Sequence, residues 1–279
     1  MTKIALIFYN LVVVPILYVS VQIAGLFNYK IRNGLSGRRG LFEKLSQQIG
    51  KSSCWPRFWI HCSSAGEYEQ GRPVIAGFKK MFPDGLVILS FFSPSGYDHI
   101  KVEDDIVKLY LPMDTYRQAR KFVALVRPTI ACVVRHDIWP NFQFRLQREK
   151  IPSFLLDASI SDEKQKVYYF FKYFVKILYS TFTLIFAVSQ EHRNRLVSLI
   201  SQPEKVQVVG DTRYDQVFQR TQEMTKIRWL IDCRYFDPNT TLVVGSSWPN
   251  DEKHLLPALA EIFREFATFK AIIVPHEVT

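Results

Sequence analysis

Short apolar runs alternate with amphipathic stretches along most of the chain after residue 56. The apolar runs, which are typical of buried strands, are 58–62, 86–91, 106–111, 129–134, 153–157, 183–188, 206–209, 242–244 and 271–274. Helical patterns lie between them at 66–82, 115–126, 138–149, 164–179 and 252–266. Near-continuous apolar strands alternating with helices predict an α/β fold built on a doubly wound parallel sheet.

The first part of the chain has a different pattern. Residues 4–27 are apolar apart from Asn10, Pro15, Ser20, Gln22 and Gly25. A stretch of about 24 residues is long enough to cross a bilayer. It predicts an N-terminal membrane-anchor helix within residues 1–30. The alternatives are a long core helix and a hairpin that lies in the membrane interface.

Basic residues after this segment predict its orientation. Only Lys3 precedes the segment, whereas Lys30, Arg32, Arg38, Arg39 and Lys44 follow it. The positive-inside rule therefore places the rest of the chain in the cytoplasm. The expected location is therefore the cytoplasmic face of a membrane.

The strand–helix rhythm is interrupted by polar residues and a proline at residues 202–204. A break of this kind indicates a domain boundary. We therefore expect one Rossmann-like domain at 31–202 and a second at 203–279. The second has too few predicted strands to cover both faces of a sheet, so it is expected to be incomplete.

Composition narrows the class of protein. The chain has 279 residues, of which 48% are hydrophobic and 14% aromatic, enough for a large core. The formal charge of +10 indicates an anionic partner, which could be nucleic acid, a membrane surface or a phosphorylated substrate. The four cysteines form no C-x-x-C pair and the histidines lack metal-ligand spacing, so no metal site is expected.

A single carboxylate stands where the first predicted strand gives way to a helix. Glu67 closes the sequence Ser64-Ala65-Gly66-Glu67, directly after the run 58–62. Ligands of open α/β sheets bind at this edge, so Glu67 is a candidate general base. The alternative is a capping box, in which Ser64 and Glu67 satisfy the helix N-terminus.

Polar residues follow other predicted strands. Asp137 comes after the run 129–134 and could face the same cleft, or it could be a helix N-cap with Arg135 as its counter-ion. Arg213 follows Gly210 and suits a phosphate, or it forms an ordinary surface ion pair.

Two further segments leave alternatives open. Gly245-Ser246-Ser247 could form an anion site at a helix N-terminus, although P-loop and dinucleotide-binding motifs are missing. The stretch 164–186 mixes lysines with Tyr and Phe, which fits a membrane interface, single-stranded nucleic acid or an aromatic core helix. Trp-Pro-Asn occurs at 139–141 and again at 248–250, each before a predicted helix.

Taken in order, these motifs resemble those of the transferases of 3-deoxy-D-manno-octulosonic acid (Kdo) in lipopolysaccharide synthesis. The motifs are His61-Cys62-Ser63-Ser64-Ala65-Gly66-Glu67, Ser93-Pro94-Ser95-Gly96-Tyr97, Trp139-Pro140-Asn141, Gly210-Asp211-Thr212-Arg213-Tyr214-Asp215, Gly245-Ser246-Ser247 and Pro275-His276-Glu277. The resemblance implies a GT-B glycosyltransferase with two Rossmann-like domains, an acceptor domain followed by a CMP-sugar domain. It implies metal-independent, inverting transfer of Kdo from CMP-Kdo to a lipid A precursor, with no cofactor.

The resemblance also implies roles for particular residues. Glu67 matches the general base, and Asp137 and Arg213 match the two transition-state stabilisers. The expected CMP-binding residues are Gly245, Ser246, Ser247, Pro275 and His276. Expected partners are CMP-Kdo, the lipid A precursor and inner-membrane lipid, without nucleic acid.

The resemblance leaves two other functions open. The chain ends at the first CMP-binding motif, so we expect it to bind CMP poorly and transfer little Kdo. The alternatives are a truncated, inactive membrane-associated binding protein and a GT-B transferase that uses another nucleotide sugar.

Overall fold

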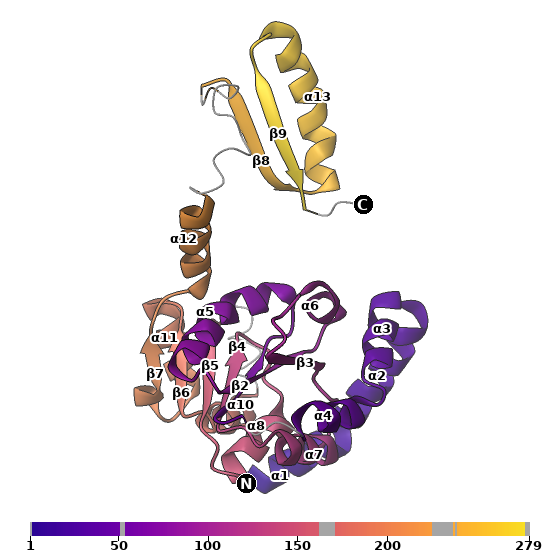
Figure 1. Cartoon of the computed structure of the whole chain (residues 1–279), viewed down its shortest axis with the longest axis vertical. Helices are drawn as coiled ribbons and strands as arrows, with labels where there is room; N and C mark the ends of the chain where they lie inside the picture. The colour runs from indigo at the N-terminus through magenta and orange to yellow at the C-terminus, as the bar shows by residue number, and fades with distance from the viewer. Residues whose placement is uncertain (1, 51–53, 162–170, 225–236, 238, 277–279) are drawn as a thin grey trace. The chain divides into compact units, whose positions relative to one another are not determined.

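The computed structural model describes residues 2–50, 54–161, 171–224, 237 and 239–276. The chain divides into two compact units, residues 1–218 and residues 219–279 (Figure 1).

The first unit is built on a parallel sheet of seven strands, in the order β3-β2-β1-β4-β5-β6-β7. Its strands are β1 (Arg57–His61), β2 (Leu86–Phe91), β3 (Ile106–Tyr110), β4 (Ile130–Val134), β5 (Ser153–Ala158), β6 (Leu184–Ala187) and β7 (Val206–Val208). The chain builds outward from β1 to β3, then returns to pair β4 with β1 and continues in the other direction. This reversal creates a topological switch point between β1 and β4, where α/β proteins bind ligands.

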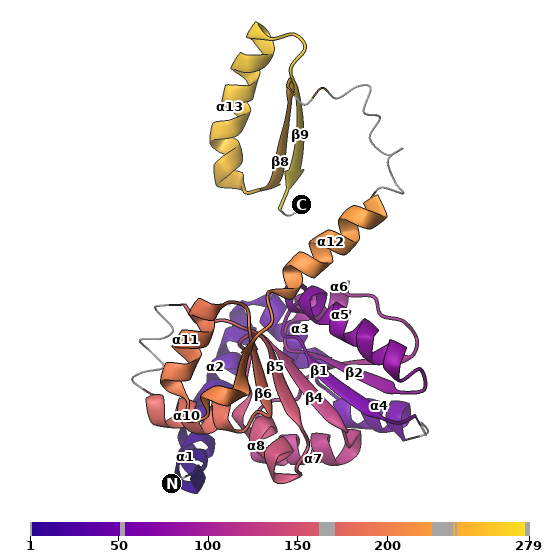
Figure 2. The same cartoon turned by 90° about the vertical axis from the view of Figure 1, so that its left-hand side faces the viewer.

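Helices cover both faces of this sheet (Figure 2). They are α4 (Leu41–Ile49), α5 (Ala65–Met81), α6 (Pro94–His99), α7 (Tyr116–Val126), α8 (Pro140–Arg148), α10 (Lys172–Ser180) and α11 (Gln190–Leu199). Helices α4, α7 and α8 bury their apolar sides on one face, around Trp59 and Ile88. Helix α5 packs on the other face, around Phe58 and Ile60. Successive residues of β1 therefore pack into the cores on opposite faces of the sheet, as expected for a strand that is covered on both faces.

The predicted strands all occur, with small differences at their ends. The boundary after residue 202 is wrong, because β7 pairs with β6 and extends the first sheet. A 3-10 turn, η2 (Pro203–Lys205), links α11 to β7 where the sequence indicated a linker. The first unit then continues into α12 (Thr212–Met224) and ends at Phe218.

The predicted helix at 164–179 is seen in part, because residues 162–170 lie outside the described residues. Helix α10 buries Val175, Leu178 and Tyr179, whereas Lys172 and Lys176 are exposed. Phe171 and Tyr173 are exposed, so the described part has one apolar side in the core and aromatic residues at the surface. The membrane-interface alternative remains a prediction.

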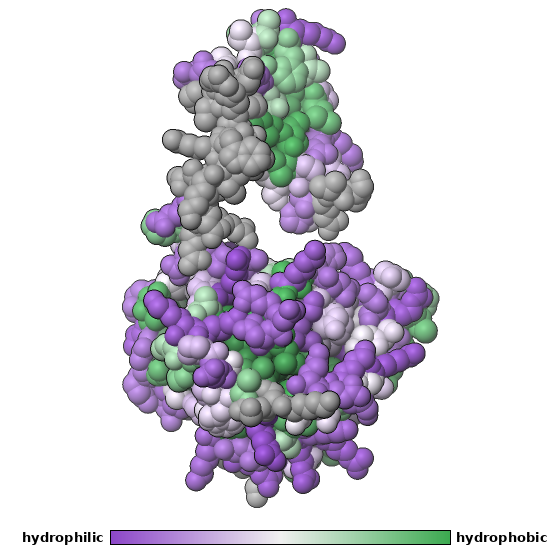
Figure 3. Space-filling view, in the orientation of Figure 1, coloured by the Kyte–Doolittle hydropathy of each residue, from purple (hydrophilic) through white to green (hydrophobic). Residues whose placement is uncertain are grey.

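After the end of α12, the described residues of the second unit form two parallel strands and a helix. Its elements are β8 (Thr241–Ser247), α13 (Pro249–Glu265) and β9 (Lys270–Pro275). The small sheet leaves large apolar side chains exposed, among them Val243, Phe263 and Val274. Figure 3 shows apolar surface gathered on this unit. Two strands and one helix are too few to cover both faces of a sheet.

The apolar N-terminal segment is helical throughout. Helix α1 (Thr2–Phe8), the π-helical turn η1 (Tyr9–Val13) and α2 (Val14–Phe27) follow without a break, and α3 (Tyr29–Gly37) packs beside α2. Residues 4–27 form the one helix in the described part of the chain that is long and apolar enough to cross a membrane. Length and composition fit an anchor, but contacts to the first unit are also present.

Candidate active site

Glu67 lies in the first turn of α5, directly after β1. Ser64 is the N-cap, and its Oγ accepts a hydrogen bond from the Glu67 backbone N–H at 3.4 Å. The Glu67 Oε2 in turn accepts the backbone N–H of Ser63 at 2.6 Å. The predicted capping box is therefore present in altered form, since the donor is Ser63 and not the N-cap. These bonds fix the carboxylate at the carboxyl edge of the sheet.

A buried histidine lies beneath this turn. His61, the last residue of β1, accepts a hydrogen bond at Nε2 from Trp139 Nε1–H at 3.2 Å, and its Nδ1 lies 3.1 Å from the Ser90 carbonyl. Because indole can only donate, Nε2 carries no proton and Nδ1–H donates to Ser90. Burial lowers the pKa of His61 to about 4, against an opposing attraction to Asp137. A neutral imidazole therefore ties β1 to β2 and to the loop after β4.

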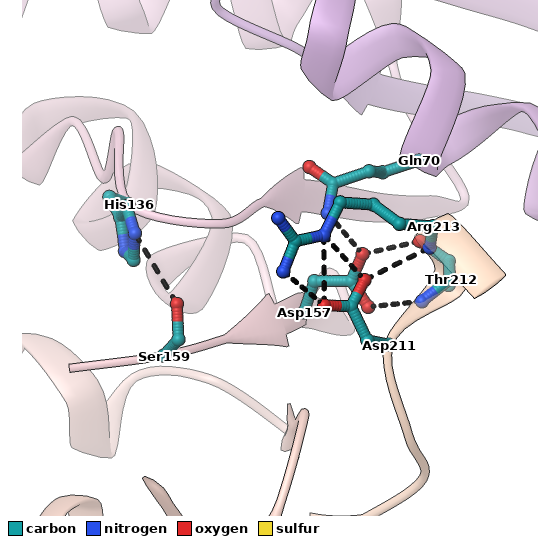
Figure 4. A network of polar contacts seen from close by, with 7 residues as sticks. All are labelled: Gln70, His136, Asp157, Ser159, Asp211, Thr212 and Arg213. Carbon is teal, nitrogen blue, oxygen red and sulfur yellow. Dashed lines mark hydrogen bonds and ion pairs between the residues drawn. The ribbon is translucent and has the colours of Figure 1, made fainter. Parts of the chain in front are cut away.

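Asp137 lies in that loop and is half-buried. Its effect on His61 places its charge near the end of β1. The N-cap alternative is wrong, because α8 begins at Pro140 with Trp139 as its N-cap. The neighbouring His136 lies 3.4 Å from Ser159 Oγ, beyond the end of β5 (Figure 4).

Asp157, which the sequence analysis did not select, is a fully buried carboxylate near the end of β5. It accepts hydrogen bonds from Gln70 Nε2 at 2.9 Å, from the Thr212 backbone at 3.2 Å and from the Thr212 hydroxyl (Figure 4). Its backbone has a φ of 51°, at a break in the register between β5 and β6. Burial raises its pKa, and the bonds from Thr212 oppose this shift.

Arg213 lies beside this carboxylate, in the first turn of α12. Its guanidinium contacts both oxygens of the Asp211 carboxylate: Nε donates to Oδ1 at 3.0 Å and Nη2 donates to Oδ2 at 2.5 Å (Figure 4). The side chain of Arg213 is 61% exposed and that of Asp211 9%. Hydrogen bonding from Arg213 lowers the pKa of Asp211. The ion-pair alternative is thus present, and it holds the guanidinium at the sheet edge.

The first unit brings its three predicted catalytic residues to one edge. Glu67, Asp137 and Arg213 follow β1, β4 and β7 respectively, which all run in the same direction. Gln70 lies one turn after Glu67 on α5 and donates to Asp157, which also holds Thr212 next to Arg213. One buried carboxylate therefore connects the helix of the candidate base to the helix of the candidate cation.

The five predicted CMP-binding residues also lie side by side, within the second unit. Ser247 pairs with Pro275 across β8 and β9, and the His276 N–H donates to the Ser247 carbonyl at 2.8 Å. His276 Nδ1 lies 2.8 Å from Ser246 Oγ, and its ring stacks on Trp248 with centroids 4.1 Å apart. These groups surround the N-terminus of α13, where backbone N–H groups favour an anion.

The structure leaves the metal question to experiment. Within the described ranges, no group of three or more His, Cys, Asp and Glu side chains could hold a metal ion. The expectation of a metal-independent, cofactor-free site remains a prediction.

The sequence matches a known protein family. The family model described as 3-deoxy-D-manno-octulosonic-acid transferase matches residues 33–216. The chain belongs to this family. A Kdo transferase of Haemophilus influenzae is 24% identical over 205 residues, covering 72% of this chain and 46% of that protein. The Kdo transferase of Aquifex aeolicus is 24% identical over 242 residues, covering 85% of this chain and 60% of that protein. The chain thus spans about half the length of these curated family members.

Solved structures confirm the fold class. The UDP-GlcNAc 2-epimerase of Methanocaldococcus jannaschii matches with a TM-score of 0.55 and 14% identity, covering 79% of this chain and 66% of that one. The Neisseria meningitidis enzyme, solved with UDP-GlcNAc, gives a TM-score of 0.52 and 15% identity, with the same coverage of each chain. The predicted parallel-sheet, GT-B-like α/β fold is therefore confirmed, whereas identity at this level shows the fold alone.

Proposed function

We propose that this chain transfers Kdo from CMP-Kdo to a lipid A precursor, with inversion at the anomeric carbon and without a metal ion. The observation that carries the proposal is the position of Glu67. Its carboxylate is held by the Ser63 N–H in the first turn of α5, beside the switch point of the sheet. Membership of the Kdo transferase family supplies the reaction class.

Glu67 acts as the general base in this proposal. A sugar hydroxyl is a poor nucleophile until its proton is removed as it attacks. The attacking oxygen bonds to the anomeric carbon, the bond from that carbon to the CMP phosphate breaks, and the proton passes to Glu67. Ser63 and the start of α5 hold the base at the carboxyl edge of the sheet.

Arg213 and Asp137 act on charge that develops in the transition state. The anomeric carbon becomes cationic as CMP departs, and a nearby carboxylate such as Asp137 stabilises that charge. Arg213 stabilises the departing phosphate, which competes with Asp211 for the guanidinium. Gly245, Ser246, Ser247, Pro275 and His276 bind the CMP portion, at the N-terminus of α13.

The proposed setting is the cytoplasmic face of the inner membrane. The acceptor is a phosphorylated glycolipid, so the enzyme has to work at a membrane surface. An apolar N-terminal helix and a net charge of +10 both favour binding to an anionic bilayer.

A donor assay tests this function. The purified chain is incubated with a labelled lipid A precursor and CMP-Kdo, UDP-sugar or GDP-sugar, with and without EDTA. We expect Kdo-bearing lipid from CMP-Kdo alone, and no effect of EDTA. Product from UDP- or GDP-sugar would replace the proposal with another GT-B transferase. Lipid binding without any turnover would favour a membrane-associated binding protein.

A further inference from the structure

Two polar side chains on the apolar N-terminal helix are bonded to the body of the first unit. The Tyr9 hydroxyl donates to Asp114 Oδ2 at 2.7 Å, and only 8% of Tyr9 is exposed. The amides of Asn10 and Asn141 bond each other reciprocally, at 2.9 and 3.1 Å. The Tyr9 ring also stacks on Phe174, with centroids 5.8 Å apart.

Asp114, the partner of Tyr9, also binds the start of helix α8. Asp114 follows β3 and accepts the backbone N–H groups of Asn141 and Phe142 at the start of α8, at 3.2 and 3.3 Å. It therefore satisfies the N-terminus of a helix that packs on the central sheet. Tyr9 adds a donor to the same carboxylate. The N-terminal helix is attached to the folded body itself and not to a loose linker.

A spanning orientation is incompatible with these contacts. If residues 4–27 crossed the bilayer, Tyr9 and Asn10 would lie in or near the hydrocarbon layer, with Asp114 and Asn141 drawn in beside them. Buried polar groups without partners are costly there, and a charged carboxylate more so. Crossing would therefore require that the helix separate from the first unit.

Away from these contacts the same helix is largely apolar and uncovered, and residues 15–20 are all exposed. Its large apolar residues with an exposure between 53% and 87% are Ile4, Ile7, Phe8, Leu11, Ile16, Val19, Ile23, Leu26 and Phe27. Most recur at intervals of three or four residues, so that they form a continuous apolar side within this exposed surface. The longer step from Leu11 to Ile16 follows the π-helical turn, which holds an extra residue.

Basic side chains stand at one end of this apolar side. Lys30, Arg32 and Arg39 are exposed, and Arg32 lies over the ring of Tyr29, which is itself exposed. A cavity of about 470 Å³ beside the helix is lined by Tyr18, Gln22 and Arg39, among others. An apolar helix face flanked by cations and aromatic residues complements a bilayer surface with anionic headgroups.

We propose that residues 4–27 lie in the plane of the membrane as a monotopic helix and do not cross it. The apolar side enters the headgroup–acyl boundary of an anionic bilayer, while Tyr9 and Asn10 hold the helix to the first unit. The catalytic edge is then kept at a fixed distance from the lipid surface. This inference does not depend on the proposed transferase activity.

Membrane topology distinguishes the two orientations. The full chain, with an N-terminal epitope tag, is expressed in a Gram-negative host and treated with protease in intact spheroplasts and in inverted inner-membrane vesicles. A monotopic helix leaves the tag protected in spheroplasts and cleaved in inverted vesicles. Cleavage of the tag in spheroplasts would place the N-terminus outside and overturn the proposal.

Substitutions test the attachment to the body. Asn10→Leu makes the segment more apolar, so a spanning helix would insert at least as well and keep its amide protection. A docked helix instead loses its bond to Asn141, and we expect at least tenfold faster hydrogen exchange in residues 4–13. Tyr9→Phe should act in the same direction, and Tyr18→Phe, a half-exposed tyrosine on the same helix, should leave exchange unchanged. Unchanged exchange in both Asn10→Leu and Tyr9→Phe would refute the docked helix.

Vesicle flotation tests the occupant of the apolar side. The chain should float with vesicles containing phosphatidylglycerol and at least tenfold less with phosphatidylcholine alone, and Arg32→Gln should weaken flotation. Failure to bind either vesicle, together with a detergent-free dimer in light scattering, would show that a second copy covers this face and would overturn the proposal.

Discussion

The two parallel-sheet edges of this chain use similar local sequences in very different surroundings. Both have a strand, a polar turn and a helix that begins with Trp-Pro-Asn, with Trp139 and Trp248 as the N-caps. At the first edge His61 and Asp157 are almost fully buried, whereas at the second Ser246 and His276 are exposed. Seven strands with helices on both faces embed polar groups, and two strands with one helix leave them in solvent. Substitutions of polar residues at the first edge should therefore lower the free energy of unfolding. Substitutions at the second edge should change it little.

The largest expected effect is on catalysis at the first edge. Glu67→Gln keeps the size of the side chain but removes its ability to take a proton. We expect the rate of Kdo transfer to fall about 10²–10⁴-fold, the usual contribution of general base catalysis. The measurement is CMP release under saturating donor and acceptor.

Glu69→Gln is the matched control, because Glu69 lies on the same helix, two residues after Glu67, and forms an ion pair with Arg72 at 3.8 Å. It should keep nearly the full rate. If Glu67→Gln were as active as Glu69→Gln, the general base would have to be another residue. The carboxylate at the first edge would then have no role in proton transfer.

Asp157→Asn should show how much the first edge depends on buried polar contacts. The new amide group turns a donor toward Gln70 or Thr212, which are donors themselves. An unsatisfied buried group costs about 1–3 kcal/mol of unfolding free energy. Chemical denaturation measures this loss, and Asp84→Asn, at an exposed turn, should be close to neutral. Equal, small losses in both variants would mean that Asp157 does not organise the edge.

Titration of His61 tests whether the first edge is closed to water. Burial lowers its pKa from 6.5 to about 4, so the unfolded chain takes up a proton before the folded one. The stability due to the neutral ring is present above about pH 6.5 and is lost as the pH falls toward 4. NMR of labelled histidine should show one ring that stays neutral down to about pH 4 and whose signal disappears in His61→Gln. Protonation of that ring near pH 6.5 would show that the edge is open to water.

Sequence alone predicted the strands and three of the edge residues for a clear physical reason. A carboxylate after an apolar run, as at Glu67 and Asp137, marks the end of a buried strand and its ligand-binding edge. Asp157 was missed because it was counted as the last residue of the predicted strand 153–157 and not as a polar residue that follows it. Its role depends on Gln70 and Thr212, which are 87 and 55 residues away in the chain.

Long-range contacts also explain why the sequence did not predict the domain boundary or the docking of the N-terminal helix. The run 206–209 is too short to show which sheet it joins, and only its pairing with β6 assigns it to the first unit. In the sequence, Asn10 was one of several interruptions of an apolar segment, and Tyr9 was counted among its apolar residues. Their partners, Asp114 and Asn141, lie more than a hundred residues further along the chain, so hydropathy could not reveal a docked helix.

The smallest expected effect is at the second edge. Ser246→Ala removes one side of the 2.8 Å contact with His276 Nδ1. Because both residues are exposed, water replaces the lost partner, and the unfolding free energy should change by no more than about 0.5 kcal/mol. Chemical denaturation of the full chain, followed by circular dichroism, measures the change. A loss as large as that of Asp157→Asn would mean that Ser246 and His276 are shielded in solution, and that the second edge is as much a part of the folded core as the first.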